Sequence, residues 1–302
     1  MWLQSESDVC AHDGKCIPQR GGKYYACAIQ AMIKDWRAKF KLALPFLWVQ
    51  ISPWEGHEAA TSMYELPEMR LAQMAANELP LTAMATAVDL GPHATSKGWD
   101  SGDEHGPDPW GNVHFRNKGP LGPRLSAAAM NIVYGNTSEA YRGPEAASAT
   151  LVQVKTPRAC SPTGGGSHGG DAATGVSIAF KDGTVGGGLE FIANQCPYEV
   201  LEKEAGMKTE APDCTENITD CINKCGWWDI EMGNGNWHTN VTVAISGDTV
   251  VVSPPTDAVG CPVYSGSAAT TPTGVRYLYA DWPVATLYNQ AGLPALPFVL
   301  AV

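Results

Sequence analysis

The apolar pattern of this chain changes near residue 140, and that change constrains the possible folds more than any other feature. Upstream of it, helical and strand patterns alternate. They predict helices over 24–42, 65–79 and 121–133 and strands over 46–51 and 82–89. Strands that alternate with helices form a parallel sheet with helices on both faces, and such sheets bind ligands at the carboxyl ends of their strands. The loop over 91–119 leaves from one of those ends.

Residue spacing also predicts which helix faces are buried. In the first helix the apolar face carries Ile29, Ile33, Trp36 and Phe40, opposite Lys34, Arg37 and Lys39. In the third helix it carries Leu121, Leu125, Ala129, Ile132 and Val133.

Downstream of residue 140 the helical period disappears, and short strand patterns remain between Gly- and Pro-rich turns. They cover 149–155, 176–180, 189–193, 241–245, 249–252 and 275–279. Ser246-Gly247-Asp248 has the composition of a hairpin turn. We therefore expect an α/β domain over residues 1–140, built on a partial doubly wound, flavodoxin-like parallel sheet, followed by a β-rich, sandwich-like domain over residues 141–302.

The charge balance argues against two classes of partner. The chain has 20 Lys+Arg against 31 Asp+Glu, a net charge of −11, whereas nucleic acids and anionic membranes attract basic surfaces. No apolar run is long enough to span a membrane. Met1-Trp2-Leu3-Gln4 has neither the basic start nor the apolar stretch of a signal peptide. Because the composition otherwise suits an extracellular protein, we expect the natural start to lie upstream.

Cysteine and glycosylation patterns favour an oxidising compartment. The chain has nine cysteines and three Asn-X-Ser/Thr sequons, which begin at Asn136, Asn217 and Asn240. They predict a secreted or lysosomal glycoprotein with most cysteines in disulfides and one thiol left over or paired outside the chain. Zinc ligation has less support, because no CxxC pair or His cluster accompanies the closely spaced cysteines (Cys214, Cys221 and Cys225).

The most informative stretch for chemistry is Asn112-Val113-His114-Phe115-Arg116-Asn117-Lys118. It lies in the loop before the last predicted helix, at the carboxyl edge of the predicted sheet. A His at that place is well positioned to act as a general base, although an isolated loop His more often bonds only to backbone.

This stretch, with Gly122 and Arg124-Leu125 after it, resembles the Ile-His-Pro-Arg-Asn-Lys signature of the sialate O-acetylesterases, a family of SGNH-type serine esterases. Other blocks follow in the family's order. Trp2-Leu3-Gln4-Ser5-Glu6-Ser7 resembles its Trp-Tyr-Gln-Gly-Glu-Ser motif. Further matching blocks are Asp35-Trp36-Arg37, Leu44-Pro45-Phe46 with Val49-Gln50, Ala87-Val88-Asp89-Leu90-Gly91, Gly274-Val275-Arg276-Tyr277, Leu287-Tyr288-Asn289, and Gly292-Leu293-Pro294-Ala295 with Pro297-Phe298.

The resemblance implies acyl transfer on an acetylated sugar, without a metal or cofactor. In such a site a Ser attacks the acetyl carbonyl, a His carries the proton, and hydrogen-bond donors stabilise the oxyanion. Carried over by motif, His114 is the catalytic base and acid. Gln4, Ser5 and Glu6 form the oxyanion or site-supporting block, with Gln4 as the candidate donor and Glu6 as an anchor of its loop.

Three departures from the family's pattern affect the mechanism. The 302 residues contain no Gly-Gln-Ser-Asn-Met run, which carries the family's nucleophile, so we expect an N-terminally truncated copy. Ser5 replaces a Gly of the oxyanion block, a poor place for a substitute nucleophile. The acid that often precedes the catalytic His is replaced by Asn112 and Gly111. Asn112 or the nearby Asp108 (with Asp103) could orient His114, and a dyad without an acid is equally compatible.

Several other residues allow two interpretations. Arg116 suits the carboxylate of an acidic sugar or a role in holding its own loop. His93, His105 and Asp103 share one loop and could hold a metal, but such a set is more typical of polar surface groups. Three tryptophans suit stacking on sugar rings or packing in a core: Trp227, Trp228 and Trp237.

The sequence thus predicts a carboxylic ester hydrolase that removes O-acetyl groups from sialic acids or related sugars. Two alternatives stay open. One is an acetylesterase that acts on another polysaccharide, because fold and site type do not fix the sugar. The other is a non-catalytic remnant whose β-rich part binds carbohydrate or packs against a partner.

Overall fold

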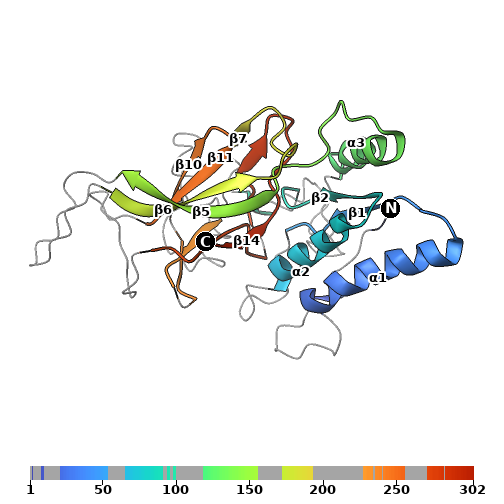
Figure 1. The fold of residues 1–302 in the computed structure, drawn as a ribbon, viewed down its shortest axis with the longest axis horizontal. Coiled ribbons are helices and arrows are strands. Elements are labelled where there is room, and N and C mark those ends of the chain that lie inside the picture. The colour runs from blue at the N-terminus through green and yellow to red at the C-terminus, as the bar shows by residue number, and fades with distance from the viewer. Residues whose placement is uncertain are drawn as a thin grey trace, which may run out of the picture.

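The computed structural model describes residues 2, 8–9, 21–53, 65–90, 94–95, 98–99, 118–155, 172–192, 227–233, 235–239, 241–255, 271–281 and 283–302. Within these ranges, the helices and a short parallel sheet lie at one end of the molecule (Figure 1). Antiparallel sheets occupy the other end.

The helical end contains, in chain order, α1 (Gly22–Phe40), β1 (Phe46–Gln50), α2 (Glu65–Met74), the 3-10 helix η2 (Ala75–Glu78), β2 (Thr82–Thr86) and α3 (Leu121–Tyr134). β1 and β2 are parallel, and their register pairs Gln50 with Thr86. The carboxyl ends of the two strands therefore share one edge. On the other side of β1, Trp2 forms a parallel bridge with Trp48, and its N–H donates to the carbonyl of Leu47 at 2.8 Å.

Alternation along β1 and β2 sends side chains to both faces of this sheet, and helices cover both faces. On one face Phe46, Trp48 and Met84 share an apolar core with the buried side chains of α1 and α2: Tyr25, Ile29, Ile33, Leu66, Met69 and Ala72. On the other face Val49 and Ala85 pack with Leu121 of α3. Such two-sided covering is what a parallel sheet requires.

The β-rich end, as far as the described ranges go, contains two four-stranded antiparallel sheets. One has the order β10 (Thr242–Ser246), β11 (Thr249–Ser253), β6 (Ala172–Phe180), β5 (Ala146–Lys155), and the other the order β14 (Phe298–Ala301), β12 (Gly274–Tyr277), β8 (Trp228–Glu231), β9 (Trp237–His238). A smaller pair there joins β7 (Leu189–Phe191) to β13 (Leu287–Asn289). The two-residue strands β3 (Ala94–Thr95) and β4 (Gly98–Trp99) pair with each other in the segment that follows β2. Both large sheets contribute to one apolar core, for example through Ile178 and Val275, as in a β-sandwich.

The local patterns predicted most of these elements. The three helices and the strands β1, β2, β5, β6, β7, β10, β11 and β12 are confirmed, with shifted ends. The predicted hairpin is also confirmed, because β10 and β11 are antiparallel neighbours joined through Gly247. Six observed strands, β3, β4, β8, β9, β13 and β14, were not predicted.

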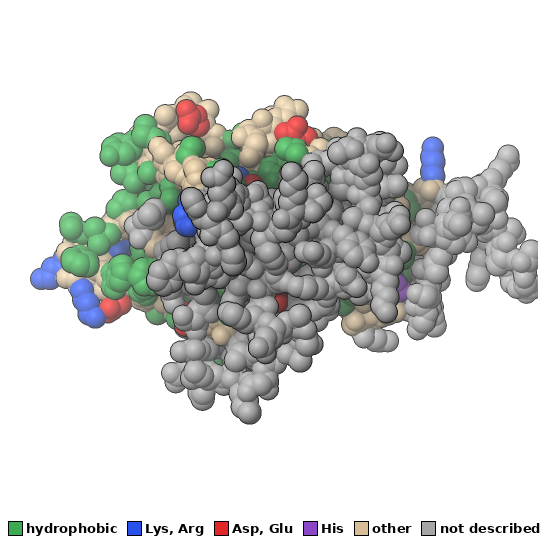
Figure 2. Space-filling model, turned by 180° about the vertical axis from the view of Figure 1, so that it is seen from behind, with side chains coloured by type: hydrophobic (Ala, Val, Ile, Leu, Met, Phe, Trp, Pro, Cys, Tyr) green, Lys and Arg blue, Asp and Glu red, His purple; other side chains and the backbone are tan. Residues whose placement is uncertain are grey.

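Some predicted details are wrong. Phe40 is 63% exposed instead of buried, because the last turn of α1 extends beyond the shorter α2 (Figure 1). Hydrophobic side chains consequently lie open next to Lys and Arg at the α1 end of the molecule (Figure 2). Val133 is 43% exposed, since α3 buries its first turns, including Arg124, more than its last one. The strand predicted over 82–89 ends at Thr86, where the chain turns.

At the coarse level the fold is mixed α/β, as predicted, with a parallel strand pair and several antiparallel sheets. The partial doubly wound, flavodoxin-like sheet and the domain boundary at residue 140 stay predictions. None of the helices in the described part of the chain has the length and apolarity needed to cross a bilayer.

Candidate functional site

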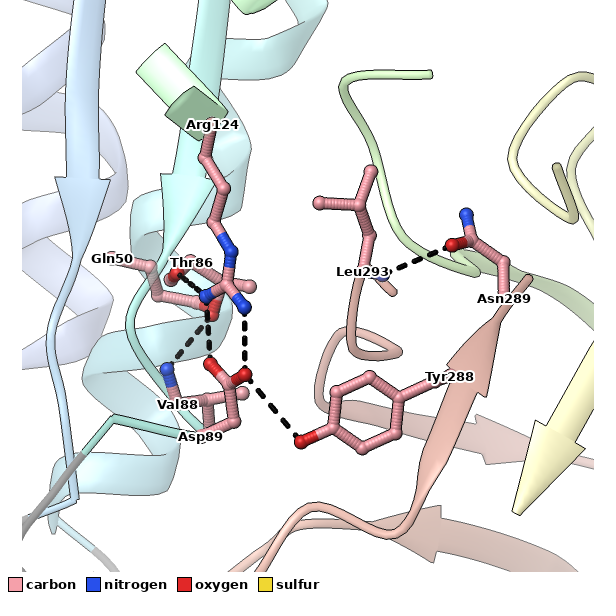
Figure 3. Close-up of polar contacts among 8 residues, drawn as sticks. All are labelled: Gln50, Thr86, Val88, Asp89, Arg124, Tyr288, Asn289 and Leu293. Atoms are coloured by element: carbon pink, nitrogen blue, oxygen red, sulfur yellow. Dashed lines mark hydrogen bonds and ion pairs between the residues drawn. The ribbon is translucent and has the colours of Figure 1, made fainter. Parts of the chain in front are cut away.

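The carboxyl edge of the parallel sheet is organised by side chains that bond to one another and to backbone (Figure 3). Gln50, at the end of β1, accepts a hydrogen bond from the Thr86 hydroxyl at 2.7 Å and donates to the carbonyl of Arg70 at 3.0 Å. The Thr86 hydroxyl accepts from Val88 N–H at 3.1 Å. The turn after β2 is therefore fixed to the end of β1, and it delivers Asp89 to this edge.

Asp89 and Arg124 form a buried, two-pronged ion pair at the same edge (Figure 3). Both carboxylate oxygens accept from the guanidinium at 2.7 Å, and the side chains are only 7% and 9% exposed. Arg124 also donates to the carbonyl of Thr86 at 2.8 Å. Such bidentate pairs are the more strongly directional kind, so the first turn of α3 is held against the end of β2.

A second buried arginine ties the end of β1 to the β-rich end. Arg70 is fully buried on α2, and its guanidinium donates to four backbone carbonyls: Ile51 at 3.2 Å, Ser52 at 2.9 Å, Ala280 at 2.6 Å and Asp281 at 2.8 Å. The Asp281 carboxylate accepts from Leu66 N–H at 3.1 Å. Segments far apart in sequence are thereby joined beside the carboxyl edge.

The C-terminal segment reaches the same region through Tyr288 and Asn289. The Tyr288 hydroxyl donates to Asp89 at 3.4 Å (Figure 3). Asn289 donates to the carbonyls of Arg142 and Thr184 at 3.1 and 3.0 Å and accepts from Leu293 N–H at 3.0 Å. The Asn289 amide thus closes the turn that runs to Leu293 and anchors it to the segments at Arg142 and Thr184.

Close backbone packing accompanies these bonds. A Cβ on Gly143 would lie 1.9 Å from the carbonyl oxygen of Pro294, so only glycine fits there. A small pocket opens beside this contact, with Asn77 at its wall. It is lined by Met84–Thr86 of β2, by Arg124, by Tyr141–Gly143, and by Leu293, Pro294 and Leu296. It lies along β2, next to the Asp89–Arg124 pair.

The motif blocks named above converge here. Gln50, Asp89, Arg124, Tyr288 and Leu293 come from five separate blocks, and the structure brings them into one connected region. The blocks were predicted from the sequence, but the roles of Asp89, Arg124 and Tyr288 were not. The available signal was an Asp just after a buried strand together with an Arg in the first turn of the next helix.

The residues predicted to react lie outside the described residues. They are His114, with Asn112, Asp108 and Arg116 around it, and the block Gln4, Ser5 and Glu6. The same holds for His93, Asp103 and His105 and for the sequons at Asn217 and Asn240. Within the described ranges no group of three or more His, Cys, Asp or Glu side chains is arranged to hold a metal ion. The described part of the edge therefore contains none of the residues that were predicted to react.

The three tryptophans considered for sugar stacking differ from one another. Trp228 is buried in the β-rich core, where its ring lies 4.2 Å from that of Tyr277 and 5.9 Å from that of Phe298, so a stacking role for it is wrong. Trp237 lies under the guanidinium of Arg276 at 4.4 Å. Trp227 is half-buried next to β8.

Two buried groups near these aromatic rings have shifted pKa values. Burial raises the pKa of Asp229, and its 2.6 Å ion pair with Arg276 opposes that shift. Burial also raises the pKa of Tyr277 to about 12, against the opposing hydrogen bonds that its hydroxyl accepts from Thr286 and Leu287 N–H, each at 3.0 Å. The Tyr277 hydroxyl thus fixes the backbone directly before Tyr288.

Comparison with known proteins agrees with the motifs. No family model matches the chain. The chain is 30% identical over 158 residues to a sialate O-acetylesterase of Mus musculus, a match that covers 48% of the chain and 25% of the mouse protein. A sialate O-acetylesterase of Rattus norvegicus is 31% identical over 134 residues, covering 40% of the chain and 22% of the rat protein. The chain thus spans about a quarter of the length of these curated relatives.

Among solved structures, a carbohydrate acetylesterase from Xanthomonas citri has a similar fold. Its TM-score is 0.60 at 24% identity, and the match covers 99% of the chain and 49% of the bacterial protein. This similarity concerns the fold, while the mouse and rat proteins carry the sequence relationship. The chain is therefore similar in sequence to sialate O-acetylesterases, as its ordered motifs indicate, and similar in fold to a carbohydrate acetylesterase.

Proposed function

We propose that the chain is part of a carboxylic ester hydrolase that removes O-acetyl groups from sialic acids or related sugars. The observation that carries this proposal is the convergence of the motif blocks at the carboxyl edge, centred on the buried Asp89–Arg124 pair. Ligands bind at this edge in open α/β sheets. The acetylated sugars named for the relatives supply the substrate class.

The proposed chemistry is acyl transfer by a Ser-His pair. The serine oxygen attacks the acetyl carbonyl, His114 accepts the serine proton, and the sugar oxygen leaves with that proton to give an acetyl-enzyme. Water, deprotonated by His114, then attacks the acetyl-enzyme and releases acetate and the free serine. Asn112 or Asp108 would orient His114, and Arg116 would pair with an acidic sugar.

The position of His114 is supported by the anchors of its loop. The loop leaves β2 after Asp89 and returns at α3, and the Asp89–Arg124 pair clamps the two ends together. Lys118 accepts a backbone hydrogen bond from Leu121 at 3.1 Å. His114 is four residues upstream of Lys118, so its Cα lies within roughly 15 Å of that residue. We therefore propose that His114 reaches the carboxyl edge.

The oxyanion block is proposed to reach the same edge from the other side. Trp2 runs parallel to β1 at Trp48, so a chain that continues in this direction brings Gln4, Ser5 and Glu6 toward the carboxyl ends of the strands. Gln4 would donate to the developing oxyanion. Because no Gly-Gln-Ser-Asn-Met run occurs in the 302 residues, we propose that the attacking serine belongs to a segment of the protein outside this sequence.

The test compares a longer form of the protein that includes such a serine with the same form carrying His114→Ala. Loss of the base should lower kcat for an aryl acetate by about 10³-fold or more. His105→Ala, in the same loop, is the matched control and should retain activity. Activity of His114→Ala within tenfold of the parent would remove His114 from the mechanism.

The same preparations separate the alternatives. Intact-mass analysis after treatment with an organophosphonate serine probe should show no label on the 302-residue chain. Stoichiometric labelling at Ser5 would contradict the proposed mechanism. Comparing kcat/KM for O-acetylated sialic acid and for acetylated plant polysaccharide fragments decides the sugar class. A longer form that binds acetylated sugar but neither takes the probe nor releases acetate would be a non-catalytic binder.

We also propose a secreted or lysosomal location with oxidised cysteines. Cys27, on α1, is exposed, and the other eight cysteines lie outside the described residues, so the pairing of all nine stays a prediction. Thiol titration of the denatured, unreduced protein should find one or a few free thiols among the nine cysteines. Eight or nine free thiols would indicate a reduced compartment instead.

A further inference from the structure

The C-terminal end of α3 fixes the position of Asn136. Gly135 ends the helix in the left-handed conformation, at φ 69°. The next residue, Asn136, donates its N–H back to the carbonyl of Met130 at 3.0 Å. Asn136 is therefore held directly beside the last turns of the helix.

The side chain of Asn136 is bonded locally through its oxygen alone. Oδ1 accepts from the Ser138 N–H at 3.0 Å and from the Ser138 hydroxyl at 2.7 Å. Among the described residues, the amide nitrogen Nδ2 has no hydrogen-bond partner. Thr137 and Ser138 are exposed. These bonds join residues only two apart, so the same conformation is available to the chain before it folds.

An uncovered apolar surface adjoins this amide. Met130, Val133 and Tyr134 lie at the spacing that puts them on one face of the last turns of α3, and they are 40%, 43% and 74% exposed. Tyr134 is two residues before Asn136, and the amide leaves from the same end of the helix. A pyranose ring attached there would find an aromatic ring and two aliphatic side chains within reach.

We propose that Asn136 is N-glycosylated and that the proximal sugars cover the face formed by Met130, Val133 and Tyr134. In the reaction, Nδ2 of Asn136 attacks the anomeric carbon of an oligosaccharide diphosphate donor. The new C–N bond replaces the C–O bond to the diphosphate, which leaves with the bonding electrons, and the amide nitrogen gives up one proton. Asn136 comes 12 residues after Arg124, which is roughly 18 Å along the axis of α3, so the attachment point lies away from the carboxyl edge.

The test places the full 302-residue chain behind a cleavable signal peptide in a translation system with endoplasmic-reticulum microsomes. Asn217→Gln and Asn240→Gln leave Asn136 as the single sequon. Chains protected from added protease should carry one glycan, which peptide N-glycosidase removes while converting Asn136 to Asp. Ser138→Ala keeps the Asn but removes the hydroxyl and should abolish the modification.

Glycan transfer precedes folding, so a variant that folds poorly still reports on the site. A protease-protected chain with an unmodified Asn136 overturns the proposal. The covering role has its own readout, in the chain folded with and without the glycan. Sedimentation should show more self-association without the glycan, and Tyr134→Ser should reduce that difference. Equal self-association of the two forms would overturn the covering role.

Discussion

The two ends of the molecule bury polar groups in different ways. At the β-rich end, the core shared by the two large sheets is lined by apolar side chains, and buried polar groups lie beside it, such as the Asp229–Arg276 pair and the Tyr277 hydroxyl. At the helical end, Arg70, Gln50, Gln73 and Thr86 are buried at the carboxyl edge and bonded to backbone or to one another. Apolar packing tolerates small exchanges of shape, whereas a buried polar group is costly when it loses its partner. The helical end thus differs in that its buried polar bonds gather at the edge where the candidate site lies.

The largest expected effect comes from Arg70→Met, which keeps much of the side chain's volume but removes every donor. Four buried carbonyls lose their partner, and each unsatisfied group costs about 1–3 kcal/mol. We expect the free energy of unfolding in urea to fall by about 4 kcal/mol or more.

Arg37→Met is the matched control, because Arg37 donates to the carbonyls of Leu44, Pro80 and Leu81 near the surface. Water can replace those bonds, so the expected cost is about 1 kcal/mol or less. Equal costs for the two variants would mean that burial is not what distinguishes the two arginines.

A core variant at the β-rich end should cost less. Ile178 on β6 is fully buried, so Ile178→Ala should lower the unfolding free energy by about 2–4 kcal/mol and Ile178→Val by about 0.5–1.5 kcal/mol. Neither should change kcat of an active longer form. A change of kcat with Ile178→Val would show that the β-rich core also sets the geometry of the site.

The last effect is confined to high pH and concerns Tyr277. Its pKa is about 12 in the folded protein against 10.0 for an ordinary tyrosine, so the folded state holds the phenolic proton more tightly than the unfolded state. This difference adds to the free energy of unfolding. The added stability is complete below pH 10 and is lost as the pH rises toward 12, by up to about 2–3 kcal/mol. Between pH 9 and pH 11, the free energy of unfolding in urea should therefore fall more for the parent than for Tyr277→Phe. Identical slopes would contradict the raised pKa.

Periodicity predicted the elements whose burial is decided locally. Ile29 and Ile33 lie on a continuous helical stripe, and both are buried as expected. The same spacing predicted wrongly that Phe40 is buried, because spacing within α1 does not show where its neighbour α2 ends. β13 has three residues, too few for an alternation to be recognised.

The candidate site was predictable as a set of segments but not as a set of bonds. The motif blocks indicated that Asp89, Arg124-Leu125 and Leu287-Tyr288-Asn289 matter. A helical pattern places Arg124 beside apolar neighbours and cannot reveal that its partner is Asp89, 35 residues upstream. Long-range pairing of charges depends on how the helix docks, and that is a property of the folded chain.

The four bonds of Arg70 also bear on how such a protein can evolve. Two of its acceptors, Ile51 and Ser52, are 19 and 18 residues away, and the other two, Ala280 and Asp281, are 210 and 211 residues away. A recombination event that divided the gene near residue 140 would put the Arg70 guanidinium in one product and two of its acceptors in the other. Each product would then expose a charged or polar surface shaped only for its lost counterpart. The β-rich end is thus not a module that recombination can exchange freely, and the two ends should be inherited together.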